Sequence, residues 1–328
     1  MPLMSVRPAP TPRAIPAEFG ADAIVWAAWL YYVDGLTQSG VAAALGVSRA
    51  SVVAYLQAAR ERGVVRIAID PDALAGVTLA RRLAARFGLK EAHVIPDLAG
   101  EGAPLTARLG AAGARLLLAS LAESDVLGVA WGRTVLAVAR ALPHRAVPGL
   151  TVAQVAGSAI GTAAFSPELC TSVIANRLAA RCVNLHAPAV LSSAEVRDLL
   201  LREPAITRQF DLIRACTKIL FGIGDVLPTG TAFASGFVPP EAGQAYLEGG
   251  AVAVVIGQFI DAAGRHVPGP LDGRLVGITL DELRRVPERI CVAGGAEKAT
   301  AMQAALTGGF ATHLVTDAGT AALLFEGG

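Results

Sequence analysis

A regular alternation of short apolar runs with amphipathic segments, from about residue 90 to the end of the chain, restricts the fold more than any other feature. Apolar runs that end near Gly or Pro are typical of buried strands, and apolar residues every three or four positions are typical of helices. The expected strands span 92–95, 126–130, 151–155, 183–185, 219–222, 253–259, 275–278, 290–293 and 313–315. The expected helices span 103–121, 134–142, 167–181, 194–201, 241–248, 280–285, 296–306 and 318–325. Strands that alternate with helices predict an α/β fold with a Rossmann-like, doubly wound parallel sheet covered on both faces.

One segment departs from this alternation. Residues 259–267 read FIDAAGRHV, which predicts a strand, a turn centred on Asp261 to Gly264 and a second strand. A turn this short can join only antiparallel strands, so we expect an antiparallel excursion from the parallel sheet.

The first part of the chain predicts a different architecture. Helical spacing indicates three short helices, at 21–33, 38–45 and 49–62. Thr37 and Ser48 are preferred N-cap residues before the last two helices, and Gly46 supplies the left-handed residue that ends the middle one. We therefore expect a trihelical unit.

At 328 residues the chain is long enough for two domains. The Pro-rich segment 1–20 is expected to be a flexible lead-in, and the trihelical unit is expected to occupy 21–68. A strand-like exit at 64–69, followed by Asp70-Pro71-Asp72, marks the boundary. Residues 69–328 then form the larger domain.

The segment QSGVAAALGVSRASVVAYLQ has the order of residues that a helix-turn-helix needs. Ala42 is small where two helices would touch, Gly46 allows the sharp turn, and Val47 and Val52 are apolar anchors. An ordinary helical hairpin within a core is the alternative. The place near the N-terminus and the change of architecture behind it favour DNA binding.

On the DNA-binding hypothesis, the third helix enters the major groove of an operator duplex. Only Arg49 and Gln57 offer strong donors to base edges, while Ser48 and Ser51 could bind phosphate. The expected DNA-facing residues are Gln38, Ser48, Arg49, Ala50, Ser51, Val53, Ala54 and Gln57. One such unit offers little contact area, so specific binding is expected to need a homodimer or homotetramer.

Composition excludes several other classes. The net charge of +1 gives no global attraction to nucleic acid, so DNA contacts must come from local charge. The four cysteines form no CxxC pair and the five histidines no metal-ligand spacing, so no disulfide frame, metal or cofactor is expected. The longest apolar runs are too short for a membrane span, and the N-terminus has no apolar signal core. We expect a cytoplasmic protein.

Four glycine-containing loops follow expected strands: GVAWGRT, FGIG, VAGGAEK and VTDAGTA. Ligands of parallel sheets bind at the carboxyl ends of strands, where these loops should converge. The amides of Gly132, Arg133 and Thr134 open a helix and could bind an anion. Lys298 is one of only three lysines in the chain and suits a phosphate or a hydroxyl. Packing glycines and a solvated surface lysine are the structural alternatives.

The sequence resembles the SorC/DeoR-type sugar-binding transcriptional regulators over nearly its whole length. The segments that carry the resemblance are WLYYVDGLTQSGVAAALGVSRASVV, GVAWGRT, FGIG, GQFIDAAGRHV, VAGGAEKATAMQAALTGG and HLVTDAGTAALL. The resemblance implies an N-terminal helix-turn-helix and an effector domain similar to phosphosugar isomerases. It also implies a sugar, polyol or sugar-phosphate effector that shifts DNA affinity, and assembly as dimers or tetramers.

The resemblance also assigns effector-binding residues. Arg133 stands where many relatives carry a small hydroxyl residue, so phosphate and unphosphorylated polyol remain alternatives. Val53 and Ala54 replace a commoner polar pair, so the operator sequence does not follow. The implied effector residues, with those of the FGIG loop, are Trp131, Gly132, Arg133, Thr134, Gly222, Gly224, Asp225, Gln258, Asp261, Gly294, Gly295 and Lys298.

A sugar-phosphate isomerase or deaminase is the alternative function, because the same fold and anion loop would serve it. Related deaminases follow their second glycine loop with Asp-Gly-His, whereas FGIG here runs into Asp225-Val226-Leu227. The segment GSAIG at 157–161 has its serine in the wrong place for a GxSxG nucleophile elbow. We therefore favour a regulator over an enzyme. A DNA-bridging protein that binds no ligand is a third possibility.

Overall fold

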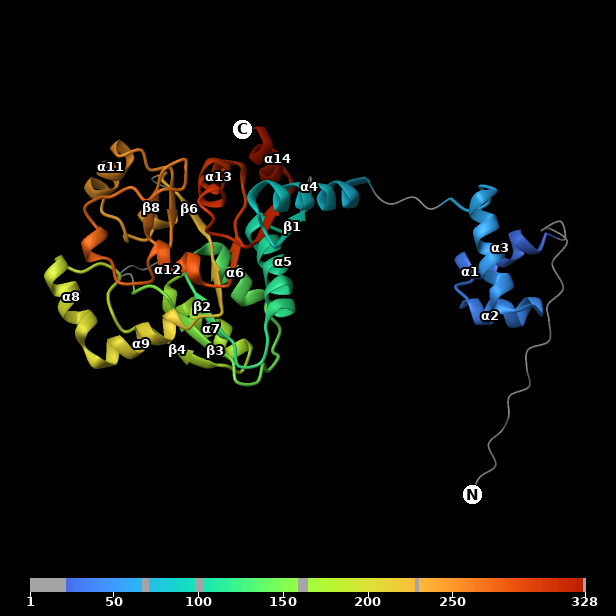
Figure 1. Ribbon diagram of the computed structural model, residues 1–328, viewed down its shortest axis with the longest axis horizontal. Coiled ribbons are helices and arrows are strands. Elements are labelled where there is room, and N and C mark those ends of the chain that lie inside the picture. Colours follow the sequence, from blue (N-terminus) through green and yellow to red (C-terminus); the bar gives the residue numbers. More distant parts are fainter. Residues whose placement is uncertain (1–21, 67–70, 98–102, 159–164, 228–229, 327–328) are drawn as a thin grey trace, which may run out of the picture. The chain divides into compact units, whose positions relative to one another are not determined.

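The computed structural model describes residues 22–66, 71–97, 103–158, 165–227 and 230–326 (Figure 1). The chain divides into two compact units, Met1–Asp70 and Pro71–Gly328. The expected lead-in, 1–20, lies outside the described residues, as does the end of the expected strand-like exit. Residues 64–66 of that exit form no strand.

The N-terminal unit contains helices α1 (Ala23–Tyr32), α2 (Gln38–Leu45) and α3 (Arg49–Glu61). The side chains of Asp22, Thr37 and Ser48 cap their N-termini. Gly46 ends α2 with φ of 67°, the left-handed conformation that glycine adopts without strain. The axes of α2 and α3 therefore meet at 102°.

An apolar core holds the three helices together. Leu30, Val41 and Val52 are fully buried, one from each helix, and Trp26 and Leu56 pack around them. Burying such a side chain stabilises the fold by about 1.5–3 kcal/mol. The core uses one face of α3, which leaves its other face in solvent.

The larger unit contains two sheets. Seven parallel strands form the main sheet in the order β1-β10-β9-β5-β2-β3-β4, and β6-β7-β8 form an antiparallel sheet. The strands of the main sheet are β1 (Glu91–Ile95), β2 (Val126–Val129), β3 (Thr151–Gln154), β4 (Arg181–Val183), β5 (Lys218–Phe221), β9 (Glu288–Val292) and β10 (His313–Asp317). Those of the second sheet are β6 (Ile223–Asp225), β7 (Ala253–Val255) and β8 (Gln258–Ile260).

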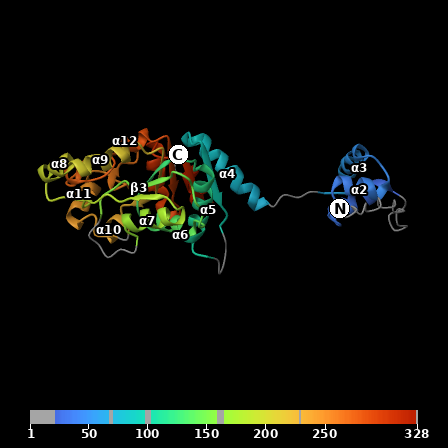
Figure 2. The ribbon, with the colours of Figure 1, turned by 90° about the horizontal axis from the view of Figure 1, so that it is seen from below.

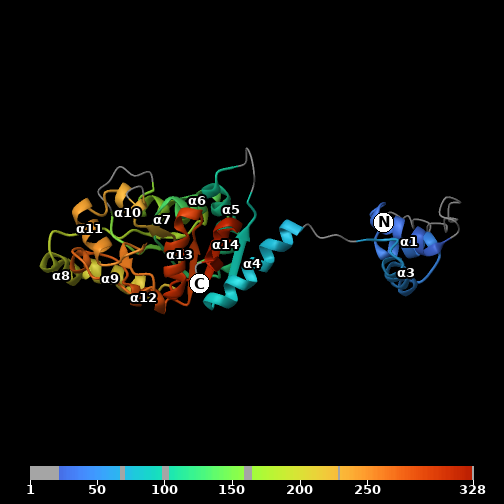
Figure 3. The same cartoon turned by 90° about the horizontal axis from the view of Figure 1, so that it is seen from above.

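Helices cover both faces of the main sheet. Helices α5, α6 and α7 lie on one face, and α4, α9 and α12 lie on the other (Figures 2 and 3). The helices of this unit are α4 (Pro71–Phe87), α5 (Leu105–Ser120), α6 (Arg133–Ala141), α7 (Pro167–Arg177), α8 (Ala194–Arg202), α9 (Pro204–Arg214), α10 (Thr231–Ala234), α11 (Pro240–Glu248), η2 (Asp272–Arg274), α12 (Leu280–Arg285), η3 (Ala296–Lys298), α13 (Ala299–Thr307) and α14 (Ala318–Glu326). The mixed α/β class and the mainly parallel sheet expected from the sequence are confirmed.

Some details of the expected pattern are wrong. The run 253–259 is two strands, because Ile256 and Gly257 turn the chain with φ of 47° and 80°. The run 275–278 makes only isolated bridges, at Leu275 and Gly277. Helix α9 and strand β6 were not expected. Pro204 begins α9, and Gly222 joins β5 to β6 where the FGIG glycines were expected only to end a strand.

The antiparallel excursion predicted at 259–267 is present in part: β8 and a turn are followed by a single antiparallel bridge, Ile260 to His266, in place of a second strand, and Asp261 N donates to Arg265 O at 2.9 Å. Within the described residues no single helix is long and apolar enough to cross a membrane. The α2–α3 pair passes that test only when its two bent halves are taken together.

The strand order explains why the glycine loops converge. The four strands that precede them, β2, β5, β9 and β10, are neighbours in the main sheet. Because the strands are parallel, their carboxyl ends meet at one edge. The loops that follow these strands therefore meet there, beside the antiparallel sheet that continues from β5.

Candidate functional site

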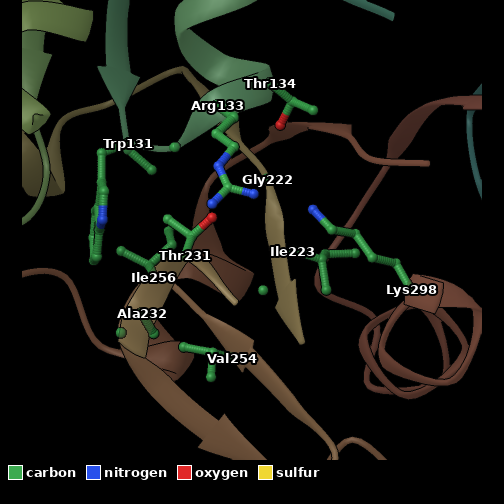
Figure 4. Close-up of a pocket in the computed structure, with 14 residues that line it drawn as sticks. Trp131, Arg133, Thr134, Gly222, Ile223, Thr231, Ala232, Val254, Ile256 and Lys298 are labelled. Carbon is green, nitrogen blue, oxygen red and sulfur yellow. The ribbon is translucent and has the colours of Figure 1, made fainter. Parts of the chain in front are cut away.

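A pocket lies at the carboxyl ends of these strands (Figure 4). Its walls come from the loop after β2, the junction between β5 and β6, the start of α10, the β7–β8 turn and the end of η3. The lining residues are Ala130, Trp131, Gly132, Arg133, Thr134, Gly222, Ile223, Gly224, Thr231, Ala232, Val254, Ile256, Gly257 and Lys298.

The N-terminus of α6 forms one wall of this pocket. Gly132 precedes the helix with φ of 131°, a conformation that side-chain-bearing residues rarely adopt, and no side chain caps this helix end. The first amides of a helix have no intrahelical acceptor and carry the positive end of the helix dipole. This wall is therefore suited to an anion.

Two cationic side chains enter the pocket from different walls. Arg133 extends from the start of α6 and Lys298 from the end of η3, and both point into the space between them (Figure 4). The Arg133 guanidinium also lies 5.6 Å from the centroid of the Phe165 ring. Among the described lining residues there is no Asp or Glu, so no carboxylate of the pocket neutralises either cation.

Glycine is needed at the junction between β5 and β6 because Thr134 approaches it closely. A Cβ on Gly222 would lie 2.9 Å from Thr134 Oγ1. Such an approach forces a neighbour to move. The glycine therefore lets the strand pass close to the start of α6, which narrows the pocket around the cations.

The opposite wall is apolar. Trp131 is 9% exposed and packs against Phe237, with ring centroids 5.2 Å apart. Ile256 is 9% exposed and has φ of 47°, which costs about 1–2 kcal/mol for a residue with a Cβ. Strained residues of this kind cluster at ligand sites, and Ile256 lines the pocket.

Seven of the twelve residues expected at the effector site line this pocket. They are Trp131, Gly132, Arg133, Thr134, Gly222, Gly224 and Lys298. Gln258 lines a neighbouring cavity, but its side chain bonds to Ile278 O at 3.0 Å and Leu280 N at 3.2 Å. It therefore supports the loop after β8.

The other four expected residues do not line the pocket; each bonds or packs against other protein groups. Asp225 accepts a bond from Leu227 N at 3.1 Å. Asp261 accepts from the amides of Ala263 and Arg265, and the bond from the Arg265 amide holds its pKa below the usual value. Gly294 and Gly295 pack against other groups, and the Gly295 amide donates to Asp317 and Thr320. That amide is therefore unavailable to a ligand.

The remaining lining residues were not expected from the sequence. They are Ala130, Ile223, Thr231, Ala232, Val254, Ile256 and Gly257. Most are apolar and lie in runs that resemble core strands. Only the Ile256-Gly257 pair carried a signal, because a glycine inside a strand pattern can mark a turn or a close approach.

The exposed face of α3 contains most of the residues expected to contact DNA. Ser48, Arg49, Ala50, Val53, Ala54 and Gln57 are exposed, whereas Ser51 and Gln38 are partly buried. Arg49 Nε donates to Gln38 Oε1 at 3.2 Å, and Gln57 Nε2 donates to Glu61 Oε1 at 2.9 Å. Val52, Leu56 and Ala59 occupy the opposite, buried face.

Comparison with known proteins identifies relatives along most of the chain. The family model described as "Putative sugar-binding domain" matches residues 73–326. The transcriptional regulator YjhU of Escherichia coli K12 is 37% identical over 93% of this chain and 95% of its own length. The transcriptional regulator LsrR of Klebsiella pneumoniae is 33% identical over 90% of each chain.

A solved structure agrees with these relatives. The full-length sorbitol operon regulator SorC of Klebsiella pneumoniae has a TM-score of 0.72 and 27% identity, over 92% of this chain and 97% of that one. The chain therefore belongs to the SorC/DeoR-type family of sugar-binding transcriptional regulators.

Proposed function

We propose that this protein is a DNA-binding regulator of a carbohydrate or polyol catabolic operon, with DNA affinity that responds to a sugar phosphate. The observation that carries the proposal is the convergence of Arg133, Lys298 and the α6 N-terminus on a pocket whose described walls hold no carboxylate. Two cations beside helix amides favour a phosphate over an unphosphorylated polyol, because uncompensated charge is costly to shield from water. The relative SorC is named for a sorbitol operon, which agrees with a polyol or its phosphate as effector.

The N-terminal unit would supply DNA binding. Its α2–α3 angle of 102° falls in the range of about 90–120° for helix-turn-helix motifs. The exposed face of α3 presents Arg49 for base edges, with Ser48 and Ser51 near the helix N-terminus for phosphates. Residues 22–66 would then form a helix-turn-helix domain, and residues 71–326 an effector domain. A homodimer or homotetramer in the cytoplasm would present two such helices to one operator.

The pocket chemistry favours a sensor over an isomerase or deaminase. Those reactions need a general acid and a general base at the sugar carbons. The described lining residues include no Asp, Glu or His, and Asp225 is tied to the amide of Leu227. A ligand held here would meet cations, amides, hydroxyls and apolar walls, which bind a sugar phosphate without supplying a carboxylate or imidazole base.

Replacing Arg49 by alanine should weaken binding to a labelled duplex from upstream of the protein's own coding region by roughly tenfold or more. The substitution removes the strongest base-edge donor of α3 and leaves its buried face intact. Fluorescence anisotropy measures the loss, with Arg208→Ala as a control: Arg208 is exposed on α9 and carries the same charge. Equal affinity and equal sequence preference in wild type and Arg49→Ala would contradict the DNA-binding assignment.

A thermal-shift screen should separate phosphorylated from unphosphorylated ligands. Sorbitol 6-phosphate, erythritol 4-phosphate and ribose 5-phosphate are suitable probes, each beside its unphosphorylated counterpart. We expect stabilisation by at least one phosphate, by about 2–3 kcal/mol at a hundredfold excess over Kd, and none by its counterpart. The stabilising compound is then incubated with the protein: rapid conversion to product would contradict the sensor assignment and favour the enzyme.

A further inference from the structure

Helix α13 begins at the pocket, next to Lys298, and α14 begins beside the same loop; side chains of both helices contact α4, the first helix of the larger unit. Lys298 lies immediately before α13, and Asp317 immediately before α14. Helix α4 is joined by residues 67–70 to the N-terminal unit. We propose that α13 and α14 transmit the occupancy of the pocket to α4, an inference that rests on the proposed function.

The first contacts join the lysine loop to α14. The Gly295 amide donates to Asp317 Oδ1 at 3.0 Å and to Thr320 Oγ1 at 2.8 Å. The Thr320 amide in turn donates to Asp317 Oδ2 at 3.0 Å, and the Thr320 hydroxyl donates to Asp317 Oδ1 at 2.7 Å. Asp317 is 5% exposed and Thr320 fully buried, so this network is shielded from water. A displacement of the lysine loop must therefore displace the start of α14 or break these bonds.

A second set of contacts joins α14 to α4. The Arg82 guanidinium lies 4.1 Å from the centroid of the Phe325 ring, and that of Arg86 lies 5.7 Å from it. Both arginines come from the last turns of α4, and Phe325 comes from the end of α14. The Phe325 ring therefore contacts two residues of α4, Arg82 and Arg86.

Gln303 joins α13 to both partners. Its amide satisfies its neighbours in only one orientation, in which the nitrogen donates to Leu324 O at 3.2 Å and the oxygen accepts from Arg86 at 3.3 Å. Gln303 belongs to the helix that starts next to Lys298. An anion bound to Lys298 would shift the start of α13. That shift would reach Arg86 through Gln303, and it would reach Phe325 through the Gly295 bonds to α14.

These contacts make a continuous set of rigid elements, and such a set becomes a coupling pathway only when coupling is measured. The quantity to measure is the ratio of DNA affinities with and without ligand, because that ratio is the coupling between the two sites. The probe is the sugar phosphate that gives the largest thermal shift among sorbitol 6-phosphate, erythritol 4-phosphate and ribose 5-phosphate. Ligand affinity is measured separately, by calorimetry without DNA.

In the full-length wild-type protein we expect the ligand to change DNA affinity by about tenfold. Phe325→Leu and Arg82→Ala should each reduce that change to under about threefold. Ligand affinity without DNA should change by less than about twofold, because neither residue lines the pocket. Arg81→Ala is the matched control: it removes the same charge from α4 at an exposed position, and the described structure records no ring contact or ion pair for it. It should keep the wild-type ratio. Arg82→Ala changes an exposed side chain, so the test stands if Phe325→Leu fails to fold.

A wild-type response that both variants retain would overturn this inference and leave the proposed function intact. Loss of ligand binding itself in both variants would also overturn it, because α14 would then only support the pocket. A wild-type protein whose DNA affinity responds to none of the probes would overturn the proposed function, and this inference with it.

Discussion

Replacing Lys298 by methionine should weaken binding of a sugar phosphate roughly 30-fold, equivalent to about 2 kcal/mol for one lost charge-assisted hydrogen bond. Lys298 points into the pocket opposite Arg133, and no carboxylate among the described lining residues competes with a ligand for it. Methionine keeps most of the apolar length of the side chain, so the pocket wall should persist. Isothermal titration calorimetry of both proteins measures the change.

Lys90→Met provides the control for the Lys298 substitution. Lys90 is an exposed lysine whose Nζ donates to Pro287 O at 3.2 Å, at the amino end of the main sheet and away from the pocket. Its replacement removes the same charge and should leave ligand affinity unchanged within about twofold, because solvent and salt screen distant surface charges. Equal affinity of wild type and Lys298→Met for the sugar phosphate would contradict the assignment of Lys298 to the effector site.

Replacing Asp317 by alanine should lower the free energy of unfolding of the larger unit by about 3 kcal/mol. The Asp317 carboxylate accepts bonds from the amides of Gly295 and Thr320 and from the Thr320 hydroxyl, all in the interior. Alanine leaves these three donors without that acceptor. Urea denaturation followed by circular dichroism measures the loss.

Asp281→Ala is the matched control for the Asp317 substitution. The Asp281 side chain is 80% exposed, and its ion pair with Arg284 is 3.3 Å long. Exposed pairs of this kind contribute about 0–1 kcal/mol, so this change should be small. An Asp317→Ala protein as stable as Asp281→Ala would mean that the buried network does not hold the lysine loop.

The sequence predicted the parts of the fold that local pattern controls. Buried strands such as β5 and β9 contain short apolar runs, and helices such as α3 have caps and spacing that do not depend on distant contacts. The β7–β8 turn was missed because Ile256 occupies a left-handed position in which its residue type is rare. Gly257 beside it was a local signal of a turn, but the apolar residues on both sides of that glycine favoured one continuous strand.

The candidate site could be predicted only where charge or glycine marks it. Arg133, Thr134 and Lys298 were found because they follow glycines after strands, and they line the pocket. Asp261 and Gly295 carry similar signals but bond within the protein, to the 261–265 turn and to Asp317. Whether a polar group faces a ligand or a neighbouring loop depends on contacts between distant segments, which a single sequence does not reveal.

The proposed function joins a sugar-phosphate pocket to DNA binding in one protein. Its most direct test is the Kd of the full-length protein for the upstream duplex, measured by anisotropy with and without the sugar phosphate that stabilises it most. We predict sequence-selective binding whose Kd changes by about tenfold or more, in either direction, when that ligand is added. In Lys298→Met, the Kd for the duplex should no longer change at the same ligand concentration. Binding that is equal for unrelated duplexes, or indifferent to every phosphate tested, would contradict the claim.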